Sequence, residues 1–357
     1  MGSGVTHVAI IVTETNGKPE DNLATSDTGD SGEVVRLASG IQAQKASPNL
    51  EFESSVLDSD CKDDSVEKDN IDKVTNQKSQ ETLKECKVCL LRKFILSGVN
   101  NGKDPRYYGI TCLSDGRIVI TDSDNNRCCL YDSSYNHVLD FMLSPGPCGI
   151  CTVDVDEVAV AFHNENKIQF LKIGDQIQPL EQISTERRCV SIVALNKVEL
   201  VYVGTTNDAS TYYYGVITRD GQEKSCFHIP RGDISYCNVY IALNSSKTRA
   251  YISCRDVRTV YCVGLDGIVY FEYKIEGDEN QGYPLGIQLD RKNNVYVVVM
   301  NSNSIHRLSP ECQLQQIAKN MIPTYPRAIC FQQSCDNFLL TSGDARNLHV
   351  CYVYELK

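Results

Sequence analysis

The stretch from Tyr107 to Ser134, YYGITCLSDGRIVITDSDNNRCCLYDSS, decides the fold. Three short apolar runs at 109–113, 118–120 and 128–131 are separated by two polar turns. The Asp-Gly and Asn-Asn pairs in these turns tolerate the positive φ angles that tight hairpins require. Runs of this length that are rich in Val, Ile and Tyr favour β-strands. The stretch therefore predicts three antiparallel strands joined by hairpin turns.

The same order of runs and turns recurs six times along the chain. The units begin at Tyr107, Pro147, Cys189, Cys237, Tyr283 and Tyr325, with spacings of 40, 42, 48, 46 and 42 residues. A period of this length suits a propeller blade of four short antiparallel strands. The sequence predicts an all-β fold, a six-bladed β-propeller over residues 86–357.

The last unit ends at Lys357 and lacks a fourth strand. The run from Cys89 to Leu96 precedes the first unit and resembles the fourth strands expected at 137–143 and 267–275. We expect this run to pair with the strand near 347–354 and so to close the ring. Closure removes sheet edges that would otherwise pair with other chains.

The first 85 residues differ in composition from the rest. They contain 17 acidic and 8 basic residues, and Phe52 is their single aromatic residue, whereas all 19 Tyr lie beyond residue 85. Such a segment has too little apolar surface to offset the entropy lost on ordering. The sequence predicts a disordered acidic tail over 1–85, followed by the propeller.

Cysteine usage and the N-terminus indicate the compartment. Sixteen of the 17 Cys lie beyond residue 85, mostly beside apolar residues, and the apolar run at 8–12 is too short for a signal peptide. These features indicate reduced, buried thiols and a cytoplasmic location. Residues 1–6, MGSGVT, fit the myristoylation pattern at Gly2, but no basic cluster follows. We expect no membrane partner unless Gly2 is acylated.

The repeat resembles the NHL repeat. The resemblance rests on Gly109-Ile110 with 115–120 and 122–127, and it recurs at 283–287 with 294–297 and at 325–329. Residues 86–357 are similar to the C-terminal propeller of tripartite-motif (TRIM-NHL) proteins. In that family the propeller recruits substrate proteins, or sometimes RNA, while an N-terminal RING, B-box and coiled coil supply ubiquitin ligase activity and dimerisation.

This chain departs from the family at its N-terminal end. A RING needs several ordered Cys and His ligands, and residues 1–85 contain only Cys61 and His7. No heptad pattern long enough for a coiled coil is present there. The resemblance therefore implies the recognition half of a ubiquitin ligase without its catalytic half.

The sequence predicts no metal site and no cofactor. The two C-x2-C pairs, Cys86 with Cys89 and Cys148 with Cys151, are 58 residues apart, and residues i and i+3 of a strand point to opposite faces. The segment from Asp122 resembles the start of a calcium loop, but it has Arg127 where that loop needs Gly. We interpret this segment as a hairpin turn.

No catalytic motif is present, and we predict that the protein is not an enzyme. The six His are isolated in sequence, and His163 and His306 are expected to be exposed near turns. A metal-dependent propeller hydrolase or lactonase remains an alternative, because its ligands come from different blades. Asp122 and Asp154 are candidates for such a channel site, although exposed-turn and strand-edge roles are favoured.

Loops between blades gather on one face of a propeller, and here they carry Arg and Tyr. The candidate binding residues, each near the start of a blade, are Arg106, Tyr107, Arg231, Tyr236, Tyr283, Tyr325 and Arg327. Arg and Tyr dominate interface energetics, so we predict that this face binds a protein segment. For Tyr283 and Tyr325, packing between blades is the competing interpretation.

RNA is the alternative ligand for this face, since Arg and stacking aromatics also bind single strands. However, the predicted propeller contains 29 acidic and 27 basic residues and so lacks the basic field of a nucleic-acid-binding protein. We favour a protein partner. The turns at 114–117 and 290–294, on the opposite rim, are the alternative location for the site.

Overall fold

The structure is a computed structural model that describes residues 84–85, 87–96, 103–206, 211–229, 238–277, 282–319, 322–333, 336–343 and 350–357. The predicted disordered tail lies outside these residues, apart from 84–85. Among the described residues, no helix has the length and hydrophobicity needed to span a bilayer.

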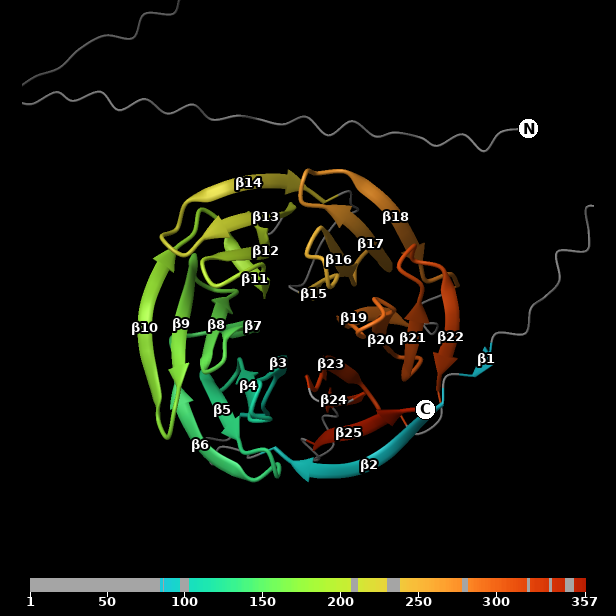
Figure 1. Cartoon of the computed structure of the whole chain (residues 1–357), viewed down its shortest axis with the longest axis horizontal. Coiled ribbons are helices and arrows are strands. Elements are labelled where there is room, and N and C mark those ends of the chain that lie inside the picture. Colours follow the sequence, from blue (N-terminus) through green and yellow to red (C-terminus); the bar gives the residue numbers. More distant parts are fainter. Residues whose placement is uncertain are drawn as a thin grey trace, which may run out of the picture. The chain divides into compact units, whose positions relative to one another are not determined.

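Six antiparallel sheets surround a central channel, which confirms the predicted six-bladed β-propeller (Figure 1). Blade 1 is β3 (Tyr107–Cys112), β4 (Ile118–Asp122), β5 (Arg127–Tyr131) and β6 (His137–Met142); blade 2 is β7 (Pro147–Asp154), β8 (Glu157–Phe162), β9 (Lys167–Ile173) and β10 (Ile177–Ser184). Blade 3 is β11 (Arg188–Ala194), β12 (Glu199–Thr205), β13 (Tyr212–Thr218) and β14 (Glu223–His228); blade 4 is β15 (Val239–Leu243), β16 (Arg249–Cys254), β17 (Thr259–Gly264) and β18 (Val269–Lys274). Blade 5 is β19 (Tyr283–Leu289), β20 (Val295–Met300), β21 (Ser304–Leu308) and β22 (Leu314–Ala318); blade 6 is β23 (Pro326–Phe331), β24 (Asn337–Ser342), β25 (Val350–Leu356) and β2 (Val88–Ile95).

The ring closes where the sequence predicted. Strand β2 pairs antiparallel with β25, from Val88 opposite Leu356 to Ile95 opposite Val350, and forms the outer strand of blade 6. A two-residue strand, β1 (Lys84–Glu85), pairs in parallel with β22 of blade 5. Both ends of the described fold are therefore held in sheets.

Each pair of neighbouring blades encloses its own apolar core, so there are six cores around the ring. Every core contains one isoleucine from a first strand, and each of these isoleucines is at most 8% exposed. They are Ile110, Ile150, Ile192, Ile241, Ile287 and Ile329. Because the same position contributes the same side chain to each interface, the sequence repeat becomes a repeat of packing.

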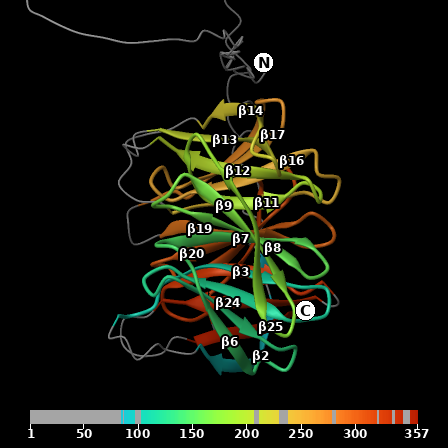
Figure 2. The same cartoon turned by 90° about the vertical axis from the view of Figure 1, so that its left-hand side faces the viewer.

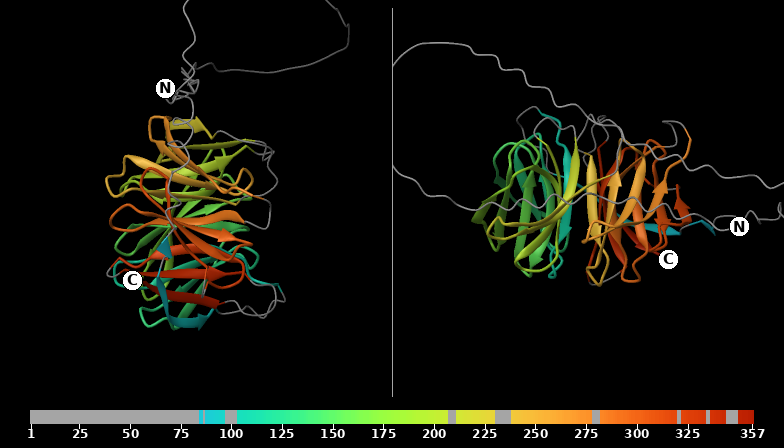
Figure 3. Two further views of the ribbon diagram at one scale, coloured as in Figure 1. Left: turned by 90° about the vertical axis from the view of Figure 1, so that its right-hand side faces the viewer. Right: turned by 90° about the horizontal axis from the view of Figure 1, so that it is seen from above.

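The hairpin turns hold the conformations that the sequence suggested. Asn126, in the turn between β4 and β5, has φ 54°, and Gly116, between β3 and β4, has φ 88°. The segment that begins at Asp122 is thus a hairpin turn, as predicted. The strands run between two opposite faces where the turns gather (Figures 2 and 3). We call the face where the first strands begin the entry face and the other the exit face.

Candidate binding face and central channel

Arg327 forms the closest contact between Arg and aromatic side chains at the junction of blades 6 and 1. Its guanidinium carbon lies 5.0 Å from the centre of the Tyr108 ring. Gly343 leaves room for this arrangement, since a Cβ at that position would lie 2.9 Å from Nε of Arg327. Nη1 of Arg327 has no hydrogen-bond partner among the described residues. This nitrogen is buried, so stacking fixes the plane of the guanidinium and any bond to a ligand must come from its other nitrogens.

Arg106 lies just before β3, and its side chain is 58% exposed. Its Nε is 3.0 Å from the Asp124 carboxylate, and this neighbouring negative charge raises the pKa of Arg106. The backbone N–H of Arg106 donates to Asp122 at 3.1 Å. Asp122 is in turn buried against Arg127, 3.0 Å away. The blade's internal ion pair thus positions the chain that presents Arg106.

Tyr283 is covered by two arginines that the sequence analysis did not select. Arg255 lies 4.9 Å and Arg258 5.9 Å from the centre of its ring. Arg258 donates from Nη1 to the backbone oxygen of Gly277 at 2.5 Å, and it forms no ion pair with a carboxylate among the described residues. The signal in the sequence was the turn 255–258, which faces the start of β19 across the blade junction.

The remaining predicted residues fall into three groups. Tyr325 is 45% exposed, has φ 50°, and donates its backbone N–H to Asn303 at 3.1 Å. Tyr107, in contrast, is only 2% exposed and packs in the core between blades 6 and 1. Its side chain does not line the entry face, because the first residue of β3 points inward. Arg231 and Tyr236 lie outside the described residues.

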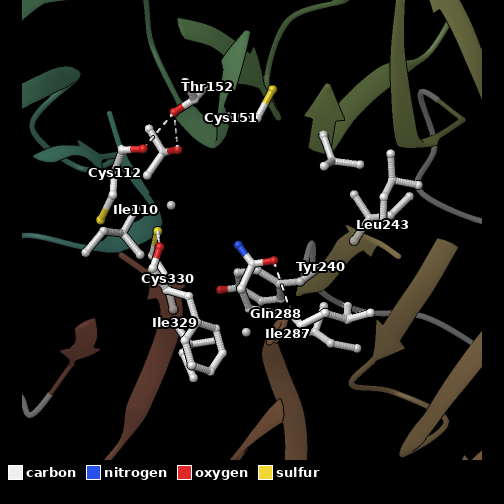
Figure 4. A pocket seen from close by; sticks show the side chains of 18 of the residues that line it. Ile110, Cys112, Cys151, Thr152, Tyr240, Leu243, Ile287, Gln288, Ile329 and Cys330 are labelled. Carbon is white, nitrogen blue, oxygen red and sulfur yellow. Dashed lines mark hydrogen bonds between the residues drawn. The ribbon is translucent and has the colours of Figure 1, made fainter. Parts of the chain in front are cut away.

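The central channel contains a cavity of about 470 Å³, lined by the first strands of all six blades (Figure 4). Asp122 and Asp154, the candidate channel carboxylates, do not line it. Asp122 is fully buried within blade 1, so an exposed-turn role is wrong for this residue. Asp154 pairs with Lys197 at 2.6 Å. Within the described ranges, no three His, Cys, Asp or Glu side chains gather as a metal site would require.

The structure also shows the burial of the C-x2-C cysteines and of the two histidines that were expected to be exposed. Cys148 and Cys151 are buried in β7, and Cys89 is half-buried in β2, while Cys86 is outside the described residues. The expected exposure of His306 is wrong. This residue is 6% exposed inside β21, where its Nδ1 lies 2.8 Å from the Tyr273 hydroxyl. His163 is half-buried, with Nδ1 2.9 Å from the backbone oxygen of Gly146.

No protein-family model matches the sequence, and a search of curated proteins gives no match. Solved structures do resemble the fold. Virginiamycin B lyase from Staphylococcus aureus has a TM-score of 0.52 and 15% identity, covering 76% of this chain and 100% of that one. The gluconolactonase XC5397 from Xanthomonas campestris has a TM-score of 0.52 and 12% identity, covering 71% and 87%.

A third similar structure is the Cps50 (Swd1) β-propeller domain of Myceliophteria thermophila. Its TM-score is 0.51 and its identity 7%, covering 74% of this chain and 100% of that domain. The three neighbours comprise two enzymes and one propeller domain. At these identities the likeness establishes the β-propeller fold and carries no information about chemistry.

Proposed function

We propose that this propeller is a non-catalytic recognition module whose entry face holds a segment of a partner protein. The observation that carries the proposal is the pair of Arg–Tyr stacks, Arg327 on Tyr108 and Arg255 with Arg258 on Tyr283. Arg supplies a fork of donors for carboxylates and backbone carbonyls, and Tyr supplies rigid contact area at low entropic cost.

The charges on this face favour an acidic or carbonyl-rich segment. Arg258 and Arg327 form no ion pair with a carboxylate in the described part of the chain. Exposed Tyr325 and Arg106 extend the surface beyond the stacks. The resemblance to TRIM-NHL propellers adds the partner class, a protein recruited in a ubiquitin-ligase-related pathway in the cytoplasm.

The test is affinity capture from cell lysate with the full chain as bait, with and without RNase. Arg327→Ala should weaken capture of a specific protein by about 1–3 kcal/mol in a subsequent titration with that purified protein. Tyr325→Asn removes the exposed ring and should weaken binding by a similar amount. Asn tolerates the left-handed backbone at this position, so the fold should be kept. Both variants should keep the wild-type melting temperature within a few degrees.

Arg291→Ala is the matched control, since this exposed arginine lies on the exit face. It should bind the partner as wild type does. Loss of binding in Arg291→Ala alone would move the site to the opposite rim. Capture abolished by RNase would replace the protein partner with RNA. A melting temperature that falls in parallel with binding would make Arg327 structural.

A further inference from the structure

The channel is constricted near the entry face by a ring of small residues. Gly109, Gly149, Ser191, Gly286 and Ala328 occupy the same level of five first strands. A Cβ on Gly109 would lie 2.5 Å from the backbone oxygen of Cys148, and one on Gly286 2.4 Å from that of Arg327. Neighbouring first strands therefore approach so closely here that larger side chains are excluded.

Blade 4 has Tyr240 at this level instead of a small residue. Its side chain packs against the core between blades 4 and 5 and also against the core between blades 6 and 1. The aromatic ring of Tyr240 therefore crosses the channel. Figure 4 shows this side chain projecting into the cavity beside Gln288. Tyr108, Arg327 and Cys148 are close enough to influence the Tyr240 hydroxyl electrostatically. Tyr240 closes the channel on the entry side.

The cavity opens on the exit face. Its lining extends from the level of Tyr240 to the turns that follow β15, β19 and β23, where Ser245, Arg291 and Gln333 are exposed. Residues of the entry-face stacks other than Tyr108 do not line it. In the described part of the chain, the cavity therefore opens at the exit face, and it shares only Tyr108 with the Arg–Tyr stacks of the entry face. Its volume of about 470 Å³ is in the range of small-molecule sites.

Below its mouth the wall of the pocket has no charged side chain, and it combines apolar side chains with the polar ones of Thr111, Thr152, Ser191 and Gln288. Five of the side chains that supply its apolar surface are Val193, Ala194, Leu243, Leu289 and Phe331. The charged lining residues, Asp290, Arg291 and Asp336, all lie in the turns at the mouth. Burial raises the pKa of Tyr240, so the floor also stays neutral. Burying a charged ligand here would be costly, whereas a neutral one loses little solvation.

Two polar groups of the pocket have hydrogen-bonding capacity to spare: the Tyr240 hydroxyl, which has no hydrogen-bond partner among the described residues, and the Gln288 amide. The Thr111 and Thr152 hydroxyls bond each other at 2.8 Å, and the Ser191 hydroxyl accepts from the backbone N–H of Ile241 at 3.2 Å. The Gln288 side-chain oxygen accepts a long bond of 3.4 Å from Leu289, and its amide nitrogen donates to no described residue. Figure 4 shows this amide within the pocket.

We propose that the pocket binds a neutral small molecule that has an apolar part and a carbonyl or hydroxyl group. The apolar part packs against Leu243, Phe331 and the Tyr240 ring. The polar group accepts a hydrogen bond from the Gln288 amide nitrogen. The mouth of this pocket lies on the face opposite the proposed protein-binding surface, so a ligand can enter while a protein partner is bound.

The experiment titrates the full chain with prodan, a neutral naphthalene that has a carbonyl group and a polarity-sensitive emission. Binding should shift the emission to the blue, with saturation at one probe per chain. Gln288→Leu keeps the size of the side chain and removes its hydrogen bond. It should weaken prodan binding about fivefold and leave the affinity for naphthalene, which has no carbonyl, unchanged.

Ala194 lines the pocket and also packs against the core between blades 2 and 3, so Ala194→Phe should abolish binding of both probes, and its melting temperature is measured to show that the variant is folded. Lys292→Ala, an exposed exit-face variant outside the lining, is the control and should bind prodan as wild type does. Prodan binding that is absent, or that persists in Ala194→Phe, would overturn the site. Equal losses of prodan and naphthalene in Gln288→Leu would overturn the hydrogen bond.

Discussion

Polar side chains inside the blades are held by partners from neighbouring strands. Arg127 is 1% exposed, pairs with Asp122 at 3.0 Å, and also contacts Asp140 of β6. His306 lies on β21 and meets Tyr273 of β18, which joins blades 4 and 5. Leaving one partner buried without the other costs more than the pair itself contributes, so single substitutions at these positions should destabilise the fold.

His306 should make the fold sensitive to mild acid. Burial, helped by the positive charge of Lys319, lowers the pKa of His306 to about 4. The unfolded chain binds a proton near pH 6.5, so folding loses stability as the pH falls from about 6.5 to about 4. Between pH 7 and pH 5 the wild type should lose about 2 kcal/mol more than His306→Phe, measured by urea unfolding.

The carboxylates titrate in both proteins, so their contribution to the pH dependence of the unfolding free energy cancels when wild type is compared with His306→Phe. Identical pH dependence in wild type and His306→Phe would show that the imidazole is protonated normally in the folded protein.

At the scale of the element, β2 is the strand on which closure depends. It comes from the start of the described chain and completes a blade whose other strands come from its end. Phe94 faces inward from β2, 5.3 Å from the Tyr131 ring of blade 1, and Ile95 beside it is 74% exposed. Strand β2 therefore contacts blade 1 through its inner face, while its outer face is exposed to solvent.

Phe94→Ala should lower the free energy of unfolding by about 3 kcal/mol, because it leaves a cavity in the core between blades 6 and 1. Ile95→Ala, on the opposite face of the same strand, should change it by less than about 0.5 kcal/mol. Urea unfolding followed by circular dichroism measures both. Equal effects would mean that β2 is not anchored through its inner face.

At the scale of the whole molecule, most described cysteines are buried in the closed ring, so the reactivity of their thiols measures unfolding. Of the 13 described free cysteines, all but Cys89 and Cys226 are buried. Burial raises the pKa of Cys128 and Cys351 well above the usual range, and access to reagents is blocked. A thiolate is the reactive form, so these residues should be inert in the native state.

Maleimide labelling, read at each cysteine by mass spectrometry, should modify Cys128 and Cys351 only as urea unfolds the protein. The two residues come from blades 1 and 6, on either side of the closure. They should therefore share one midpoint, because opening either side of the ring exposes both. Among the described cysteines, half-buried Cys89 and Cys226 should label before these two. Separate midpoints for Cys128 and Cys351 would show that blades unfold independently.

The six blades and the closing strand could be predicted from the sequence. Both follow from local patterns: alternating apolar runs, turn residues such as Asn126 and Gly116, and a period that repeats along the chain. Local conformation and burial are imposed on each strand by neighbours close in sequence, so a linear pattern records them.

The surroundings of single side chains were decided only by tertiary structure. Tyr107 and Tyr325 both stand near the start of a blade, yet one is buried and the other exposed, because the backbone at each position turns differently. Tyr240 closes the channel because its five counterparts are small and packed against other blades. Such contacts join residues more than a hundred positions apart, and no local pattern encodes which of them meet.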